Sequence, residues 1–151
     1  MNEARLIILF IIFFFYSYLI NILNLDSYLP DGFIINILLM ASFLQRVPSV
    51  YFFIFLGFIA DLFFSEIVGP YMFCYFLSGL FLNFETLRWI QRAFLEQIIL
   101  LFFLSLILNM LLLTANEISF DFQRVVINPF ANIGFWTLLF FIQRGKWLKN
   151  I

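Results

Sequence analysis

The sequence has no histidine and a single cysteine, and only 11% of its 151 residues are charged. Histidine is the commonest metal ligand and acid–base catalyst, so its absence beside the lone Cys74 excludes a Cys/His metal cluster and an intrachain disulfide. Soluble domains average about 25% charged residues, so this chain lacks the residues to cover itself with a water-facing surface. The composition therefore excludes a soluble globular protein.

Apolar residues make up 65% of the chain, and a chain this apolar would not stay solvated as a disordered polymer. The net charge of −1 provides no basic patch, so we expect no nucleic-acid partner and look for partners in the lipid bilayer and in other proteins. The length fits one domain. We predict that residues 1–151 form a single integral membrane domain.

Six apolar stretches predict an all-α polytopic membrane protein with six transmembrane helices. The polar segments between them contain residues that cap or break helices, such as Asp31 and Pro48. The second to fourth stretches, at about 1.5 Å per residue, are only about 20–24 Å long, so they need neighbouring helices, local membrane thinning or a partly re-entrant geometry. The predicted spans are residues 6–23, 32–44, 49–64, 70–84, 94–114 and 125–142.

Lysine and arginine are concentrated on one side of the predicted bundle. Arg124 is the only cation on the other side, which carries most of the acidic loop residues. The positive-inside rule therefore places both termini in the cytoplasm. The cations on the predicted cytoplasmic side are Arg5, Arg46, Arg88, Arg92, Arg144, Lys146 and Lys149.

Asp61 is the carboxylate that lies deepest in a predicted span. A charge facing lipid is costly, so Asp61 should point into the bundle or be protonated. Two roles stay open: a structural anchor that accepts backbone N–H hydrogen bonds from the turn at 65–69, or a ligand for a transported ion or substrate. Gly57, one turn earlier on the same face, predicts a close helix approach. Glu96 lies one turn after Arg92, with which we expect a solvated ion pair.

The last two predicted spans carry polar pairs at a spacing of four residues, Ser105 with Asn109 and Asn128 with Asn132. Each pair shares one helix face and is predicted to hydrogen-bond to another helix. No catalytic triad, paired carboxylates or glycine-rich phosphate loop occurs in the sequence. We therefore predict a non-enzymatic protein without a cofactor.

The residues Gly57 and Asp61, with Gly69 eight positions later, resemble the glycine, aspartate and later glycine of the MreD family, small inner-membrane proteins of the bacterial rod-shape system. In this sequence the pattern lies across the third and fourth predicted spans. The resemblance covers about residues 25–149. Further elements that carry it are Leu29-Pro30, Gln45-Arg46-Val47, Arg88, Arg92, Asn109 and Arg144-Gly145-Lys146.

This resemblance implies a multi-pass protein of the bacterial inner membrane. It implies a non-enzymatic scaffold of the elongasome, the cell-elongation complex that synthesises sidewall peptidoglycan. The implied partners are an MreC-like bitopic membrane protein, a RodA-type glycosyltransferase with its transpeptidase, and, indirectly, MreB filaments.

The MreD fold is thought to resemble the S-components, six-helix substrate-binding subunits of energy-coupling-factor vitamin transporters, and this provides an alternative function. S-components typically dock to their energising module through an Ala-x-x-x-Ala motif in the first helix. Residues 6–16 contain no small residue that would permit such docking. No cluster of polar side chains for a vitamin is evident in the sequence either, so we expect a scaffold rather than a transporter subunit.

Overall fold

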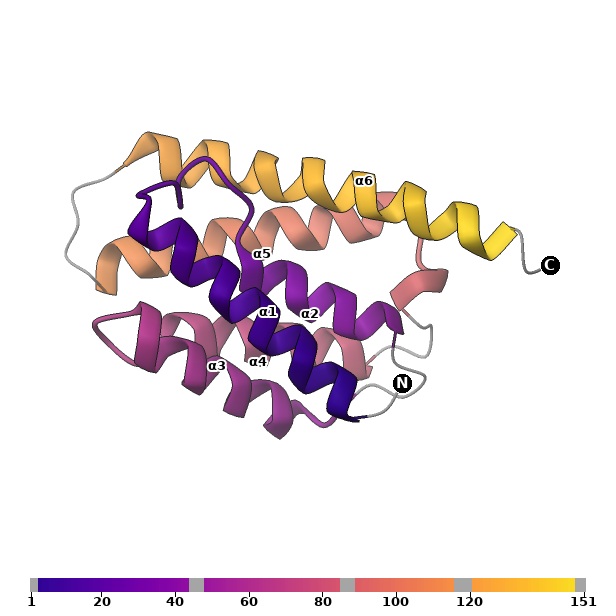
Figure 1. Ribbon diagram of the computed structural model, residues 1–151, viewed down its shortest axis with the longest axis horizontal. Coiled ribbons are helices and arrows are strands. Elements are labelled where there is room, and N and C mark those ends of the chain that lie inside the picture. Colours follow the sequence, from indigo (N-terminus) through magenta and orange to yellow (C-terminus); the bar gives the residue numbers. More distant parts are fainter. Residues whose placement is uncertain (1–2, 44–47, 85–88, 116–120, 149–151) are drawn as a thin grey trace.

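The computed structural model describes residues 3–43, 48–84, 89–115 and 121–148, which form six α-helices and two short helical turns without a β-strand (Figure 1). The prediction of an all-helical protein with six helices is confirmed. Each helix overlaps one predicted span, and α4 has the predicted bounds. The helices are α1 (Glu3–Ile22), α2 (Gly32–Phe43), α3 (Val50–Phe64), α4 (Pro70–Phe84), α5 (Phe94–Ala115) and α6 (Asn128–Leu148), with turns at Trp89–Gln91 and Gln123–Ile127.

Local sequence explains where α2 and α4 begin. The Asp31 carboxylate accepts hydrogen bonds from the backbone N–H groups of Phe33 and Ile34, at 2.9 and 3.1 Å, and so caps the first turn of α2. Pro70 opens α4, a position where its missing N–H costs no helical hydrogen bond. Gly69, just before it, has a φ of 154°, a backbone conformation that residues with a side chain rarely adopt.

Helix α2 lies at the centre of the bundle and contacts α1, α4 and α5 (Figure 1). Every residue from Phe33 to Ala41 is buried. A helix that is apolar on all sides is stable only inside a larger assembly of helices, which explains this position. The hairpin of α3 and α4 packs on one side of α2, and the pair α5 and α6 packs on the other.

Two helical segments are long and apolar enough to cross a membrane, Phe94–Ala115 and Gln123–Ile142. Four shorter apolar helices accompany them: Ile7–Ile22, Gly32–Ser42, Val50–Phe64 and Pro70–Phe84. At about 1.5 Å rise per residue, these four are too short to cross a core of about 30 Å on length alone. Among the described residues, length and composition thus identify two helices that could cross a membrane, and they do not by themselves support six crossings.

The connections alternate between the two ends of the bundle. Figure 1 shows that α1 begins and α6 ends at the same end. The segments 24–31 and 65–69 lie at the opposite end, which is called the loop end below. Asp61, which is buried, and Asp31, which is partly exposed, both lie at the loop end.

Candidate functional site

Asp61 fixes the loop end of the hairpin between α3 and α4. Its side chain is 0% exposed and accepts three backbone hydrogen bonds, from the N–H groups of Gly69 at 2.9 Å, Tyr71 at 2.8 Å and Met72 at 2.9 Å. The predicted hydrogen bond from the turn at 65–69 to Asp61 is confirmed at Gly69. The hydrogen bonds from Tyr71 and Met72 show that the Asp61 carboxylate mainly caps the N-terminus of α4. A carboxylate at this position also interacts favourably with the positive end of the helix dipole.

Gly57 permits this hairpin to close. A Cβ atom placed on Gly57 would lie 2.5 Å from the Cα of Met72, so the two backbones are in direct contact there. The predicted close helix approach is confirmed. The three residues of the Gly57, Asp61 and Gly69 pattern therefore meet around the first turn of α4.

The polar pairs of α5 and α6 join those two helices. Asn109 donates to the Oδ1 of Asn128 at 3.0 Å, and Asn132 donates to the hydroxyl of Ser105 at 2.8 Å. All four residues are buried. The predicted interhelical hydrogen bonds are confirmed, and they leave no buried amide of this network without a partner.

The same network holds the segment 24–31 in place. The Nδ2 of Asn128 donates to the carbonyl oxygens of Asp26 at 2.9 Å and Leu29 at 2.7 Å. The Oδ1 of Asn132 accepts the N–H of Asp31 at 2.6 Å. Residues about 100 positions apart in sequence are thus joined at the loop end.

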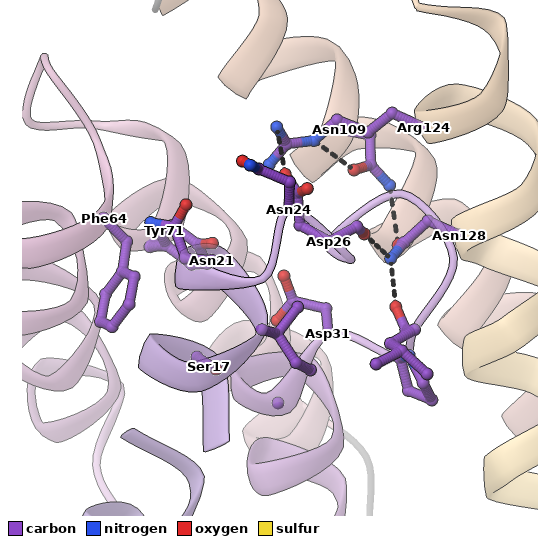
Figure 2. Close-up of a pocket in the computed structure, with 14 residues that line it drawn as sticks. Ser17, Asn21, Asn24, Asp26, Asp31, Phe64, Tyr71, Asn109, Arg124 and Asn128 are labelled. Carbon is purple, nitrogen blue, oxygen red and sulfur yellow. Dashed lines mark hydrogen bonds and ion pairs between the residues drawn. The ribbon is translucent and has the colours of Figure 1, made fainter. Parts of the chain in front are cut away.

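A polar pocket of about 260 Å³ lies between these elements (Figure 2). Its walls come from α1, the segment 24–31, the start of α2, the end of α3, the start of α4, α5, and the turn at Gln123–Ile127 with the start of α6. Figure 2 shows Asp31 facing a space that has Asn21 and Tyr71 on one side and Asp26 and Arg124 on the other. The labelled lining residues are Ser17, Asn21, Asn24, Asp26, Asp31, Phe64, Tyr71, Asn109, Arg124 and Asn128.

Two of the three charged residues of the pocket form an ion pair. The Nη1 of Arg124 lies 2.8 Å from the Oδ2 of Asp26, and the side chains are 16% and 34% exposed. The Nε of Arg124 also donates to the Oδ1 of Asn109 at 3.4 Å. This pairing fixes the guanidinium at one wall of the pocket.

Asp31 is the third charged residue, and its environment is less favourable to charge. Burial raises the pKa of the Asp31 carboxyl above its ordinary value. The backbone N–H groups of Ile34 and Phe33, the Arg124 charge and the Tyr71 hydroxyl oppose this shift of the pKa without cancelling it. The Asp31 carboxyl thus binds its proton more tightly in the folded protein.

The remaining predicted site residues lie apart from this pocket. Arg92 is only 4% exposed, and its guanidinium carbon lies 4.2 Å from the centre of the Phe81 ring. The expectation that Arg92 is solvated is therefore wrong, because the guanidinium is stacked on an aromatic face, whereas its pairing with Glu96 stays a prediction. Arg46 and Arg88 lie outside the described residues.

The sequence analysis missed the pocket, since no cluster of polar side chains for a vitamin was evident in the sequence. The structure brings polar side chains together here, and their use for a vitamin stays untested. Asp26, Asp31 and Arg124 share one predicted side of the membrane, and this shared side was the available signal. It did not indicate a pocket because about 93 residues separate Asp31 from Arg124, and only helix packing brings them together.

Comparisons of the chain with protein-family models, with curated proteins and with solved structures found no match.

Proposed function

We propose that all six helices cross a bacterial inner membrane, with both termini in the cytoplasm. The end of the bundle where α1 begins and α6 ends is the basic end of the sequence, in agreement with the positive-inside rule. Large apolar side chains are exposed along α1, α3 and α6, among them Ile8, Phe55 and Leu138. Apolar surface of this extent is typical of contact with lipid or another protein.

Cysteine labelling tests this topology. In a Cys74→Ser background, Ser27→Cys at the loop end should react with a membrane-impermeant maleimide in intact cells. Ser49→Cys, at the start of α3, should react only after the inner membrane is opened. Labelling of Ser49→Cys alone in intact cells would contradict the proposed orientation.

Within that membrane the chain is proposed to act as a non-enzymatic scaffold of the elongasome, similar to MreD. The observation that carries the proposal is the convergence of Gly57, Asp61 and Gly69 at the closed α3–α4 hairpin. These residues carry the resemblance, and their contact gives the shared pattern a structural reason. The exposed apolar faces offer surface for the proposed partners: an MreC-like bitopic protein and a RodA-type glycosyltransferase with its transpeptidase, linked indirectly to MreB filaments.

Depletion in a rod-shaped host is the decisive experiment for the scaffold. Cells should become wide and round, and expression of Gly134→Ala should restore their width, since a Cβ at Gly134 meets nothing within 4 Å. Copurification from native membranes should recover the proposed partners. Unchanged cell width after depletion would refute the scaffold function.

The polar pocket favours a second candidate function, that of a substrate-binding subunit similar to an S-component. The exposed face of α1 argues against it, because bulky residues such as Ile11 and Phe15 occupy that face. Growth after depletion that one added vitamin restores, with no change in cell width, would support this second candidate.

A further inference from the structure

The pocket at the loop end has the construction of a small ligand site. Residues of all six helices line it, together with the segment 24–31 and Arg124, so its shape depends on the whole bundle rather than on one loop. Its volume of about 260 Å³ is close to the lower limit of ligand pockets, which is about 300 Å³. The pocket would therefore accept a small molecule or a single head group.

The charges of the pocket are unbalanced. Arg124 forms an ion pair with Asp26 at 2.8 Å, whereas Asp31 has no such pair among the described residues. The N–H groups of Phe33 and Ile34 both bind the Oδ1 of Asp31. Among the described residues no backbone N–H binds the Oδ2 of Asp31, although the Tyr71 hydroxyl also interacts with this carboxyl, and Figure 2 shows the carboxylate directed toward the open space.

The amide donors of Asn109 and Asn128 at the wall of the pocket are already engaged, whereas the hydroxyl of Ser17, which can donate or accept, has no partner among the described residues. The Nδ2 of Asn109 donates to the carbonyl of Ser105 and to Asn128, and the Nδ2 of Asn128 donates to the carbonyls of Asp26 and Leu29. A ligand that supplies donors and a positive charge would fit this arrangement better than an anion. A primary ammonium group offers three donors and one positive charge.

We propose that the pocket binds a ligand through a primary ammonium group, with Asp31 as its counter-ion. The N–H groups of the ligand would donate to the Oδ2 of Asp31, in a charge-assisted hydrogen bond within the pocket. Two sources share this chemistry, a free small amine and the ethanolamine head group of a membrane lipid. The inference is independent of the scaffold proposal, because it rests on the pocket alone.

Ethanolamine is the probe for the free amine. The full chain is placed in nanodiscs of phosphatidylglycerol, which has no amine, and titrated with ethanolamine or with neutral ethylene glycol by calorimetry. Ethanolamine should bind and ethylene glycol should not. Asp31→Asn should weaken binding at least tenfold, whereas the matched variant Asp121→Asn, outside the pocket, should bind as the unmodified chain does.

Native mass spectrometry tests the lipid source. After exchange into mixed phosphatidylethanolamine and phosphatidylglycerol, the unmodified chain should retain phosphatidylethanolamine and Asp31→Asn should not. Retention without binding of free ethanolamine assigns the lipid head group, and binding of free ethanolamine without retention assigns the free amine.

A pocket-filling variant guards against a folding defect, because Asp31 also caps α2. Asn21→Phe places a ring at the wall of the pocket and leaves the hydrogen bonds of Asp31 intact. It should abolish ethanolamine binding while the chain keeps its helical circular dichroism spectrum. The proposal is overturned if neither amine source binds, or if both Asp31→Asn and Asn21→Phe bind as the unmodified chain does. Cell width and partner copurification report separately on the scaffold.

Discussion

Two carboxylates lie at the loop end of the bundle, and they are used differently. Both oxygens of Asp61 accept backbone N–H groups, three in all, from the turn and from the start of α4. The Asp31 carboxylate accepts two backbone N–H groups, both from α2 and both on a single oxygen, and it also interacts with the Tyr71 hydroxyl. The number of backbone donors thus distinguishes Asp61, which accepts three N–H groups on two oxygens, from Asp31, which accepts two N–H groups on one oxygen.

The surroundings of Asp61 are also more tightly packed than those of Asp31. Next to Asp61, the contact of Gly57 with Met72 leaves no room for even one added carbon. Next to Asp31, a pocket of about 260 Å³ remains open between the helices. A closed hairpin and an open pocket therefore lie in one small bundle, which favours a structural role for Asp61 and a binding role for Asp31.

The largest effect should come from removing the Asp61 carboxylate. Asp61→Leu leaves three buried N–H groups without an acceptor, each at a cost of about 1–3 kcal/mol, so we expect the free energy of unfolding to fall by about 3 kcal/mol or more. Asp61→Asn should be intermediate, because an amide presents one accepting oxygen. Denaturant titration in bicelles measures both, and a loss below about 1 kcal/mol for Asp61→Leu would contradict the comparison.

Overpacking of the closed hairpin should have the next largest effect. Gly57→Ala puts a methyl group against the backbone of Met72, and overpacking of this kind costs about 1–3 kcal/mol. Gly134→Ala is the matched control in α6, where no atom lies within 4 Å of the added Cβ. The control should be neutral or stabilising by up to about 1 kcal/mol. Equal unfolding free energies for the two variants would show that the hairpin can relax around the methyl group.

The sequence alone allowed most of the closed hairpin to be predicted. Gly57, Asp61 and Gly69 lie within 13 consecutive residues, so helical spacing and a short turn suffice to place them near one another. The prediction stopped at the turn and missed Tyr71 and Met72, because the donors depend on how α4 is directed toward the end of α3. The helix bounds were also predictable, since apolar runs and helix-breaking residues determine them.

The pocket was not predictable in the same way. Nine of its fourteen lining residues lie between Ser17 and Gly32, but the other five, from Phe64 to Asn128, come from distant parts of the chain. The spacing of Asn128 and Asn132 predicted a shared helix face, but not that this face would hold the segment 24–31. Such a site forms through contacts between helices that are far apart in the sequence, and these contacts cannot be read from a single sequence.

A substitution at Arg124 tests the proposed binding role of Asp31. Arg124→Gln removes the partner of Asp26 and leaves a second unpaired carboxylate in the pocket. Ethanolamine binding in nanodiscs should then become severalfold tighter. The pair is partly exposed, so the free energy of unfolding should fall by only about 1 kcal/mol or less. Weaker ethanolamine binding would show that Arg124 itself contacts the ligand.

The pH dependence of stability should provide the smallest effect. The pKa of Asp31 is raised in the folded protein, so its protonated form is favoured there relative to the unfolded chain. This contribution is fully present below the ordinary pKa of 3.8 and is lost as the pH rises through the folded-state value.

The control for this measurement is the variant Asp31→Asn, whose side-chain amide does not titrate. Groups that face or interact with Asp31 from the packed elements are Tyr16, Tyr71, Cys74, Tyr75 and Arg124. These groups are common to both chains, so the difference in unfolding free energy isolates the carboxyl. The unmodified chain should lose stability relative to Asp31→Asn between pH 4 and pH 8, and saturating ethanolamine should reduce this loss, because the ammonium group stabilises the ionised carboxylate. If the difference in unfolding free energy stays constant over this range, Asp31 would resemble Asp61, a carboxylate whose hydrogen bonds within the fold are sufficient.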